Sequence, residues 1–561
     1  MKIPPYPPLV KGGWGDFHIK GLSKNRFSPY FILLIIISAA ICLYLYSAHF
    51  QAAGLHIDDG IYIVAAKALH QDSGYRIESL PGSLPQTHYP PLFSLGLSLC
   101  WHINASFPEN IHLMRIFSAI CAIFVLFLSY IYIRVKSELN FAIILLFLIA
   151  VAFNPWFVLY SGQIMSEMLF TLLSLTSIIF FIRCDQGMGK AGLYFSLLFA
   201  ALAIYTRSIG IALFASYFFR YLWRRRFKAS LGILSFTILI CIPWIYWICN
   251  NIAPADGVTA GNIHHSYFEG LIPSVIQNIR HLPFAVSTRI MSIPSILCAF
   301  PKITEMPSGL NYLFVLIFNF MVWFFLVTGI VYELRKSPSV ETFYLVITFV
   351  ILILFPTWTQ ERYLVPLLPF ILFHLLRGIK AVREDILSFP SYRRVAKSMW
   401  IAGVAVLFIG IPVMGNLCSA WSFVREHPAN GEGSFIVVER ACDWIRHNTK
   451  KEDVIASQFY DPVIYLLSER KAVVADIRNY SARYINKPEL LYNEAQILQR
   501  IRRHHADYLL LWGTDMKEVN KFTLFNKEID KIFNRYPEAF RLVYDDEKNF
   551  AVYKVEMASA Q

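Results

Sequence analysis

Two adjacent carboxylates follow the first long apolar segment of the chain. Asp58 and Asp59 lie where a chain that leaves a bilayer returns to water. Ionisable groups at a membrane edge are candidates for function, and a carboxylate there could act as a general base toward a hydroxyl. Asp is also favoured at helix N-termini, so the pair could instead cap an interfacial helix. Their position alone leaves both interpretations open.

Other ionisable side chains collect at the same ends of the predicted membrane helices. Glu167 begins the fourth predicted helix, Arg207 follows the fifth, and Glu361 and Arg362 lie in the turn before the tenth. Guanidinium groups bind phosphate oxygens in a bidentate manner, so the two arginines could hold a phosphate. Single arginines also snorkel at helix ends, but this side is otherwise depleted of Lys and Arg, which favours binding. Glu167 and Glu361 could simply pair with these arginines.

The composition is that of a polytopic membrane protein. The 561 residues are 56% hydrophobic and only 16% charged. A soluble fold does not need so much apolar surface, whereas a chain that crosses a bilayer several times does. The nine Cys are scattered singly without a CxxC pair, so neither a disulfide framework nor a zinc site is indicated.

Eleven segments have the length and low charge of membrane-spanning helices. They are 29–47, 111–133, 140–155, 164–182, 191–205, 208–223, 231–250, 311–332, 342–357, 363–376 and 399–417. The stretch 286–300 could hide a further re-entrant or spanning piece, and a total of twelve or thirteen helices is an open alternative. The expected fold is therefore an α-helical polytopic membrane domain.

The distribution of Lys and Arg predicts the orientation of these helices. Basic residues concentrate in alternate loops, such as 220–228 and 377–397, which the positive-inside rule places in the cytoplasm. The tail, 1–28, is then cytoplasmic, the membrane domain covers 29–417, and loops 48–110 and 251–310 are outside. Because topology accounts for the basic excess, no nucleic-acid partner is expected.

The C-terminal region, 418–561, is predicted to be a small extracytoplasmic α/β domain, because its helices and strands alternate. The expected helices are 436–447, 461–468, 488–503 and 516–533, and the expected strands are 453–457, 471–475, 507–512, 540–544 and 549–555. It contains no Gly-rich phosphate loop and no GxSxG motif. In the first outer loop, 59–70 is expected to form an amphipathic helix on the membrane, followed by a second apolar piece at 92–103.

Several short motifs together resemble membrane-bound GT-C glycosyltransferases. They are the acidic pair Asp58-Asp59 followed by Tyr62 and Ala65-Ala66, then His88-Tyr89-Pro90-Pro91-Leu92, Ser166-Glu167, Thr206-Arg207-Ser208-Ile209-Gly210 and Glu361-Arg362-Tyr363-Leu364-Val365-Pro366. The likeness covers roughly 30–420. It is to bacterial relatives of the dolichyl-phosphate-mannose protein mannosyltransferases and of the aminoarabinose transferase of lipid A, a glycosyltransferase family 39-like group.

The resemblance implies that the protein transfers a sugar from a polyprenyl-phosphate donor at the outer face of the bacterial cytoplasmic membrane. The acceptor could be a protein, a lipid or a glycan. The first acid of the family's pair, here Asp58, is the catalytic one. Asp59 replaces the Glu that relatives often have. His88 stands near the place where some relatives have a phosphate-binding Lys, although it could also be a loop residue without a role.

The residues then suggest an inverting displacement in one step. Asp58 would accept the proton of the acceptor hydroxyl while Arg207 and Arg362 stabilise the departing lipid phosphate. Asp59 and Glu167 could orient the acceptor or hold a divalent cation, and no other cofactor is expected. Neighbours on a helix project about 100° apart, so one of the two aspartates is expected to face the cavity.

Two different classes of function remain open. A transporter or flippase of lipid-linked sugars would be expected to carry internal repeats and polar residues near the membrane midplane, and neither is evident. A membrane anchor that presents the C-terminal domain to a partner would leave the outer acids and arginines unexplained.

Overall fold

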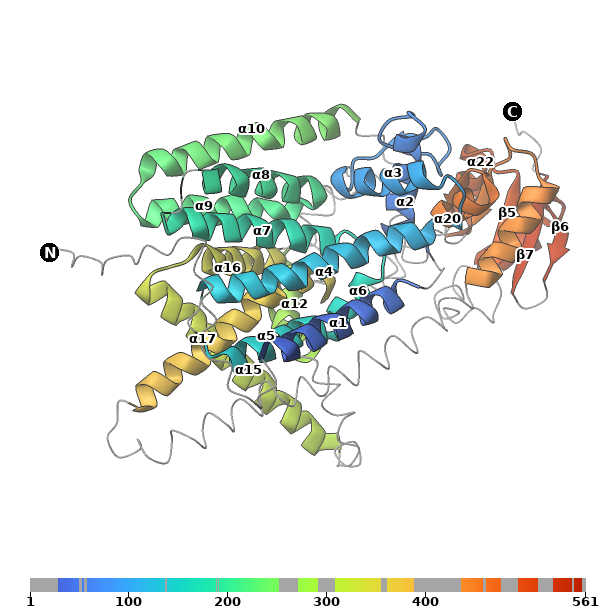
Figure 1. Cartoon of the computed structure of the whole chain (residues 1–561). Coiled ribbons are helices and arrows are strands. Elements are labelled where there is room, and N and C mark those ends of the chain that lie inside the picture. Colours follow the sequence, from blue (N-terminus) through green and yellow to red (C-terminus); the bar gives the residue numbers. More distant parts are fainter. Residues whose placement is uncertain are drawn as a thin grey trace.

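A bundle of helices and a C-terminal sheet occupy opposite ends of the computed structural model (Figure 1). The structure describes residues 29–49, 53–54, 58–136, 139–187, 189, 191–251, 271–290, 308–354, 361–387, 435–457, 461–475, 493–512, 528–546 and 549–556. The predicted tail 1–28, the eleventh predicted helix at 399–417 and the predicted boundary at 418 lie outside these residues.

Every predicted span that falls on described residues overlaps a helix. Six of these helices are long and apolar enough to cross a membrane, or seven spans if one bent pair is counted as a span. The six are α1 (Pro29–Ser47), α4 (Ile111–Lys136), α7 (Glu167–Asp185), α10 (Phe227–Asn251), α15 (Ser308–Lys336) and α17 (Leu368–Leu387). The shorter helices of the bundle are α8 (Ala191–Thr206), α9 (Ile211–Trp223), α12 (Leu271–Phe284) and α16 (Val340–Ile353). The chain is therefore a multi-pass membrane protein.

The predicted span 140–155 is broken in the structure. α5 (Phe141–Ala152) is followed by α6 (Pro155–Ser161), and the two axes are bent by 55°. The side chain of Asn154 accepts hydrogen bonds from the backbone N–H groups of Trp156 and Phe157, which caps α6. Pro155 suits the first position of a helix because it lacks an N–H donor. The local sequence thus ends one helix and begins the next.

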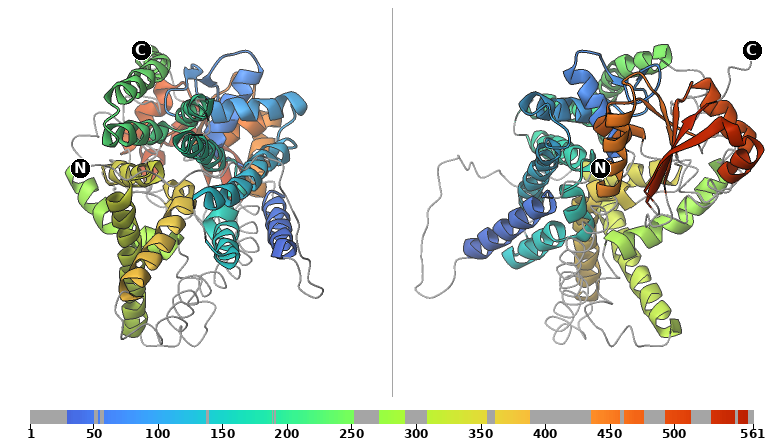
Figure 2. Two further views of the ribbon diagram at one scale, coloured as in Figure 1. Left: turned by 60° about the vertical axis from the view of Figure 1, so that its left-hand side comes forward. Right: turned by 90° about the vertical axis from the view of Figure 1, so that its right-hand side faces the viewer.

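Two glycines allow α15 and α17 to pack closely where they cross, as the views in Figure 2 show. A Cβ on Gly329 would lie 1.9 Å from the carbonyl oxygen of His374, and one on Gly378 would lie 1.9 Å from that of Phe325. Small residues at such crossings let helix backbones approach in membranes, where van der Waals contact drives association. This crossing fixes α17 and with it the short segment that precedes α17.

The first outer loop contains α2 (Asp58–His70), the hairpin β1 (Arg76–Ile77) and β2 (Leu84–Pro85), and α3 (Leu92–Ile103). The structure confirms both predicted helical pieces. However, α2 is buried around nearly its whole circumference, so the expectation of an amphipathic helix on the membrane surface is not met. Its expected polar face is covered as well, because the Lys67 ammonium lies 5.6 Å from the Trp101 ring and 4.8 Å from the Tyr465 ring.

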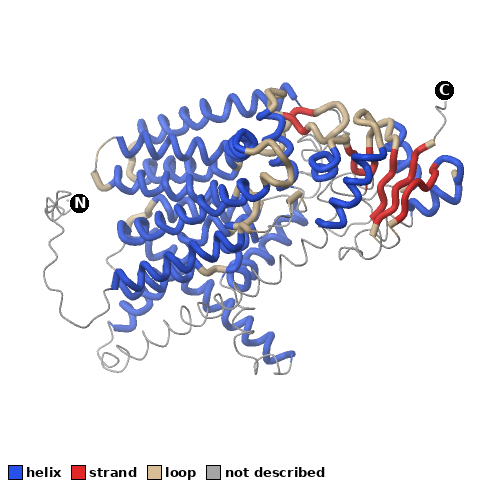
Figure 3. The backbone as a smooth tube through the Cα atoms, turned by 45° about the vertical axis from the view of Figure 1, so that its right-hand side comes forward, coloured by secondary structure: helices blue, strands red, loops and turns tan. Residues whose placement is uncertain are grey.

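The C-terminal region has the predicted order of helices and strands. Its five-stranded sheet has the order β4-β3-β5-β7-β6, with β3 parallel to β4 and β5 and with β7 antiparallel to β5 and β6. The strands are β3 (Ile455–Ser457), β4 (Ala472–Val474), β5 (Tyr508–Trp512), β6 (Phe540–Asp545) and β7 (Phe550–Val555), and the helices are 435–448, α20 (Asp461–Ser468), α22 (Glu494–Arg503) and 528–535. In Figure 3 the strands of this sheet gather at one end of the molecule.

One face of this sheet shares its core with the outer loop. Leu510 packs in a cluster with Ile61 of α2 and Trp101 of α3, whereas its neighbour Leu509 packs with Ile497 of α22 on the other face. Successive residues of a strand point to opposite faces, which explains the division. The outer loop is thus held between the helical bundle and the C-terminal sheet (Figure 1).

The contact at Gly329 leads to a prediction on stability. Replacing Gly329 with Ala forces α15 away from α17, because the added Cβ would meet backbone rather than a flexible side chain. We expect a loss of about 1–3 kcal/mol, measured as a lower thermal unfolding midpoint of the purified protein in detergent.

Gly232→Ala in α10 is the matched control. Its added Cβ would have no neighbour within 4 Å, so it should leave stability unchanged or raise it slightly. Equal midpoints for the two variants would contradict the packing described here.

Candidate functional site

The site forms where four parts of the chain end on the same side of the bundle. Asp58 is the first residue of α2, and Glu167 is the first residue of α7. Arg207 directly follows α8, and Arg362 lies in the short helix η3 (Glu361–Tyr363) before α17. Charged groups are costly in hydrocarbon, so helix ends are where an apolar bundle can carry them.

Asp58 is held by two donors from distant parts of the chain. Arg362 Nη1 forms an ion pair with its Oδ2, and the Tyr89 hydroxyl donates to its Oδ1 over 2.6 Å. Burial opposes ionisation of Asp58, but the charge of Arg362 and the bond from Tyr89 outweigh it, so its pKa lies below the ordinary value. Asp58 is therefore ionised at neutral pH, and its side chain keeps 16% of its surface exposed.

Asp59 points into the protein, and only 5% of its surface is exposed. Its Oδ2 accepts the backbone N–H of Gly54 over 2.7 Å, and its Oδ1 accepts that of Gly60 over 2.9 Å. Both glycines touch α20, since a Cβ on Gly60 would lie 2.8 Å from Pro462 and one on Gly54 would lie 2.8 Å from Val463. These contacts place Asp59 between the start of α2 and the C-terminal domain.

Arg207 forms the centre of a second cluster. Its Nη1 donates to Glu167 Oε1 over 2.6 Å and to the Ser166 hydroxyl over 3.0 Å. The Tyr62 hydroxyl lies 3.1 Å from the same Ser166 oxygen, which connects α2 to the start of α7. Glu167 is fully buried, and its Oε2 has no hydrogen-bond partner among the described residues. The side chain of Arg207 itself keeps 12% of its surface exposed.

Tyr363 brings the two arginines together. The guanidinium carbon of Arg207 lies 5.1 Å from the centre of its ring, and that of Arg362 lies 5.2 Å from it. Cations within about 6 Å of an aromatic face are attracted to its quadrupole. A single ring therefore holds two positive charges at one place, where an anion such as a phosphate would be stabilised by both.

The loop that carries His88 and Tyr89 is anchored from several sides. The Tyr75 hydroxyl donates to the Tyr89 carbonyl over 2.8 Å, and the Trp247 indole of α10 donates to the Gln86 carbonyl over 2.9 Å. The rings of Tyr62 and Tyr89 are 4.7 Å apart, and those of His88 and Tyr89 are 4.4 Å apart. Burial lowers the pKa of His88, so its imidazole is neutral at pH 7 and does not replace a lysine as a fixed charge.

The structure thus brings most of the predicted site residues into one connected group. They are Asp58, Tyr62, His88, Tyr89, Glu167, Arg207, Arg362 and Tyr363. Asp59 lies beside this group with its carboxylate turned to backbone N–H groups. The side chain of Glu361 lies outside what the structure describes.

Sequence reasoning did not single out Ser166, Tyr75 or Gln86 as site residues. Ser166 stood in a recognised motif beside Glu167, and that position at the head of a helix was the available signal. Tyr75 and Gln86 hold the loop in place through hydrogen bonds to Tyr89, His88 and Trp247. Their spacing in the sequence carries no comparable signal.

The carboxylates do not assemble into a cation site in the described part of the chain. There, no three His, Cys, Asp or Glu side chains are grouped as metal ligands. The oxygens of Asp58 are taken by Arg362 and Tyr89, and those of Asp59 by two backbone N–H groups. Divalent cations such as Mg²⁺ and Ca²⁺ bind several oxygens at once, and Glu167 Oε2 alone does not supply them.

Comparison with known proteins identifies the fold. No family model and no curated protein matches the sequence. Among solved structures, ArnT from Cupriavidus metallidurans bound to undecaprenyl phosphate matches with a TM-score of 0.54 and 12% identity, over 94% of this chain and 98% of that one. Its apo form matches with a TM-score of 0.52 and 13% identity, over 93% and 97% of the two chains.

A second match comes from an archaeal protein. The oligosaccharyltransferase AglB from Archaeoglobus fulgidus, in complex with an inhibitory peptide and a dolichol-phosphate, matches with a TM-score of 0.52 and 11% identity, over 96% of this chain and 76% of that one. ArnT and AglB both have the GT-C fold. The expected fold is therefore confirmed: the chain has the membrane-embedded GT-C architecture with a small sheet-containing C-terminal domain.

Proposed function

We propose that the protein is a glycosyltransferase that uses a polyprenyl-phosphate-linked sugar as its donor. The observation that carries this proposal is the arrangement of one ionised aspartate, Asp58, beside two arginines gathered on Tyr363 at one end of a membrane bundle. A lipid-linked phosphate reaches water at this level of a bilayer. The structures of ArnT with undecaprenyl phosphate and of AglB with a dolichol-phosphate share this fold, which supports the choice of donor.

Arg362 and Arg207 would bind the donor phosphate. Each arginine forms an ion pair with one carboxylate, Arg362 with Asp58 and Arg207 with Glu167. These four side chains therefore carry no net charge before the donor binds. A phosphate would share the remaining N–H donors of both guanidinium groups, as is common for arginine. During reaction, the same donors would stabilise the negative charge that develops on the leaving phosphate.

The transfer would be a single displacement at the anomeric carbon. The acceptor oxygen forms a bond to that carbon as the bond to the phosphate oxygen breaks, and the electron pair leaves with the polyprenyl phosphate. Asp58 takes the acceptor proton. A phosphate needs no protonation to leave, so one base suffices, in contrast to the acid and base pair of ordinary glycoside hydrolysis.

Arg362 connects donor binding to the basicity of Asp58. In the ion pair, the charge of Arg362 lowers the pKa of Asp58 and makes it a weak base. A donor phosphate that draws Arg362 toward itself would weaken this pairing and raise the pKa of Asp58. The carboxylate would thus become a better base once the donor is bound. Asp59, with both oxygens on backbone N–H groups, would position the first turn of α2.

The acceptor would approach from the side of the outer loop and the C-terminal domain. α2 carries Asp58 at its start and packs against α20 of that domain, so the domain borders the site. In the proposed topology the N-terminus is cytoplasmic, and the site and the C-terminal domain face the periplasm of a bacterial inner membrane. The acceptor is then an extracytoplasmic lipid, glycan or protein.

Replacing Asp58 with Asn tests the proposal. Purified protein should release polyprenyl phosphate from radiolabelled polyprenyl-phosphate sugars in the presence of an envelope extract as acceptor. Asp58→Asn should lower the turnover about 10²-fold or more, since a general base contributes on this scale, while donor binding persists. The measurement is the rate of donor consumption, together with donor affinity from titration.

Asp72→Asn is the matched control, because Asp72 is an exposed residue of the same loop with a positive φ that Asn tolerates. Its rate should equal that of the wild type. If Asp58→Asn turns over the donor like the wild type, Asp58 is not the base. If no donor is consumed but lipid-linked sugar crosses reconstituted vesicles, the protein is a flippase instead.

The pH dependence of the rate provides a second prediction. The base must be ionised, so kcat/KM should stay constant as pH falls until it reaches the lowered pKa of Asp58 in the free enzyme. Tyr89→Phe removes a bond to the ionised carboxylate, which raises this pKa and moves the acid limb to higher pH. The acid limb of kcat, which reports the donor complex, should lie above that of kcat/KM.

The matched control is Tyr194→Phe, a change at an exposed tyrosine in α8. Its pH profile should coincide with that of the wild type. Coincident acid limbs for the wild type and Tyr89→Phe would show that the group that limits the rate in acid is not Asp58.

A further inference from the structure

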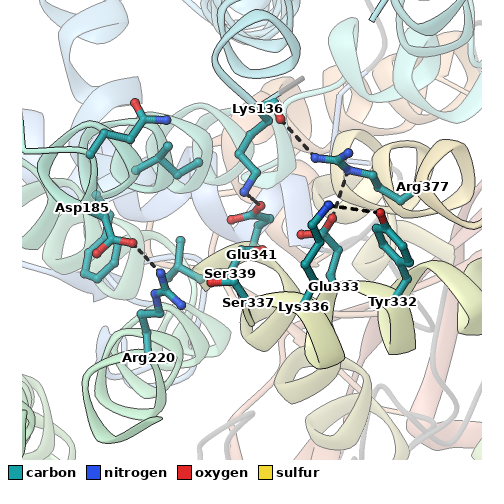
Figure 4. Close-up of a pocket in the computed structure, with 14 residues that line it drawn as sticks. Lys136, Asp185, Arg220, Tyr332, Glu333, Lys336, Ser337, Ser339, Glu341 and Arg377 are labelled. Atoms are coloured by element: carbon teal, nitrogen blue, oxygen red, sulfur yellow. Dashed lines mark hydrogen bonds and ion pairs between the residues drawn. The ribbon is translucent and has the colours of Figure 1, made fainter. Parts of the chain in front are cut away.

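A polar cavity lies at the end of the bundle opposite to Asp58. Its volume is about 250 Å³, slightly below the usual range of small-ligand pockets. Charged side chains from α4, α7, α9, α15, α16 and α17 line it and point toward its centre, as Figure 4 shows. They are Lys136, Asp185, Arg220, Glu333, Lys336, Glu341 and Arg377. The proposed transfer chemistry makes no use of any of them.

The lining carries four cations and three carboxylates. Lys136 pairs with Glu341, Arg377 with Glu333, and Arg220 with Asp185, at 2.5, 3.0 and 2.7 Å. Lys336 is the fourth cation, and its ammonium donates a hydrogen bond to the Tyr332 hydroxyl over 3.3 Å and forms no ion pair among the described residues. The cavity therefore has one positive charge in excess, and an anion would neutralise it.

Two deeply buried groups retain unused hydrogen-bonding atoms. Glu341 has no exposed surface and pairs with Lys136 through its Oε1, and within the described part of the chain its Oε2 makes no hydrogen bond. Arg220 is 5% exposed, and its Nε likewise lacks an acceptor among those residues. Buried polar atoms are costly unless they are paired. The cavity thus offers the Arg220 Nε–H donor and the exposed Lys336 ammonium to an anion, and the Glu341 Oε2 acceptor to an N–H or O–H group.

The cavity lies at the level of lipid head groups. Lys136, Asp185 and Lys336 are the last residues of α4, α7 and α15, and each of these helices is long and apolar enough to span a membrane. The ends of spanning helices coincide with the polar layer of a bilayer. Phosphodiesters are the most abundant anions in that layer.

We propose that this cavity binds the phosphodiester head group of a membrane lipid that also carries an N–H or O–H donor. The phosphodiester oxygens would contact Lys336 and Arg220, and the donor would bond to Glu341. Phosphatidylethanolamine has both features, whereas phosphatidylcholine lacks the donor and diacylglycerol lacks the phosphodiester. The distribution of Lys and Arg places this face in the cytoplasm, so the lipid would belong to the inner leaflet. The proposal does not depend on the transfer reaction.

Lys336→Gln and Arg335→Gln form a matched pair that tests it. Both residues are exposed at the end of α15 and both changes remove one positive charge, but only Lys336 lines the cavity. Delipidated full-length protein in detergent is titrated with phosphatidylethanolamine, and bound lipid is counted by native mass spectrometry. We expect Lys336→Gln to weaken binding about tenfold and Arg335→Gln to leave it unchanged.

Lipid selectivity provides the second measurement. Phosphatidylethanolamine should bind more tightly than phosphatidylcholine to the wild type, and Glu341→Gln should reduce this difference. Equal binding to Lys336→Gln and Arg335→Gln, or equal binding of diacylglycerol, would overturn the proposal. Glycerophosphoethanolamine or inorganic phosphate that stabilises the protein as well as the lipid does would overturn the assignment to a lipid.

Discussion

The ion pair between Arg362 and Asp58 joins residues 304 positions apart and connects the first loop to the segment before α17 at one end of the bundle. Asp58 begins the helix of the first outer loop, and Arg362 lies in the short segment that leads into α17. That segment is held in turn by the close crossing of α17 with α15 at Gly329 and Gly378. The position of the candidate base therefore depends on the packing of α17 against α15 as well as on its own loop.

The membrane sorts the ionisable residues into two layers. Charges are costly in hydrocarbon, so they gather at the two ends of the helices, where they pair with one another. In the outer layer Asp58, Glu167, Arg207 and Arg362 balance in charge, and Tyr363 gathers the arginines toward a site where phosphate could enter. In the inner layer the pairing leaves Lys336 and Glu341 Oε2 available at a cavity. In the two proposals made above, each layer would bind a different lipid-borne group.

The C-terminal domain supports the candidate site by packing against the loop that carries Asp58 and Asp59. One face of its sheet completes the core of the outer loop, and α20 contacts the two glycines whose N–H groups hold Asp59. A shift of this domain would displace the start of α2, where Asp58 lies. Under the proposed function, an acceptor bound by the domain would lie near the candidate base.

Three features could be predicted from the sequence alone: the membrane helices, the order of helices and strands in the C-terminal region, and the location of Asp58, Arg207 and Arg362 at the same end of the bundle. These features follow from local composition, from the length needed to cross a bilayer and from the exclusion of charge from hydrocarbon. Other features became visible in the three-dimensional arrangement: Asp58 pairs with Arg362 while Asp59 accepts backbone N–H groups, Ser166 bridges Tyr62 and Arg207, and α2 is buried against the C-terminal domain. Those outcomes depend on which distant segments meet, and a partner far away in the chain leaves no periodic or compositional signal in the residues that it contacts.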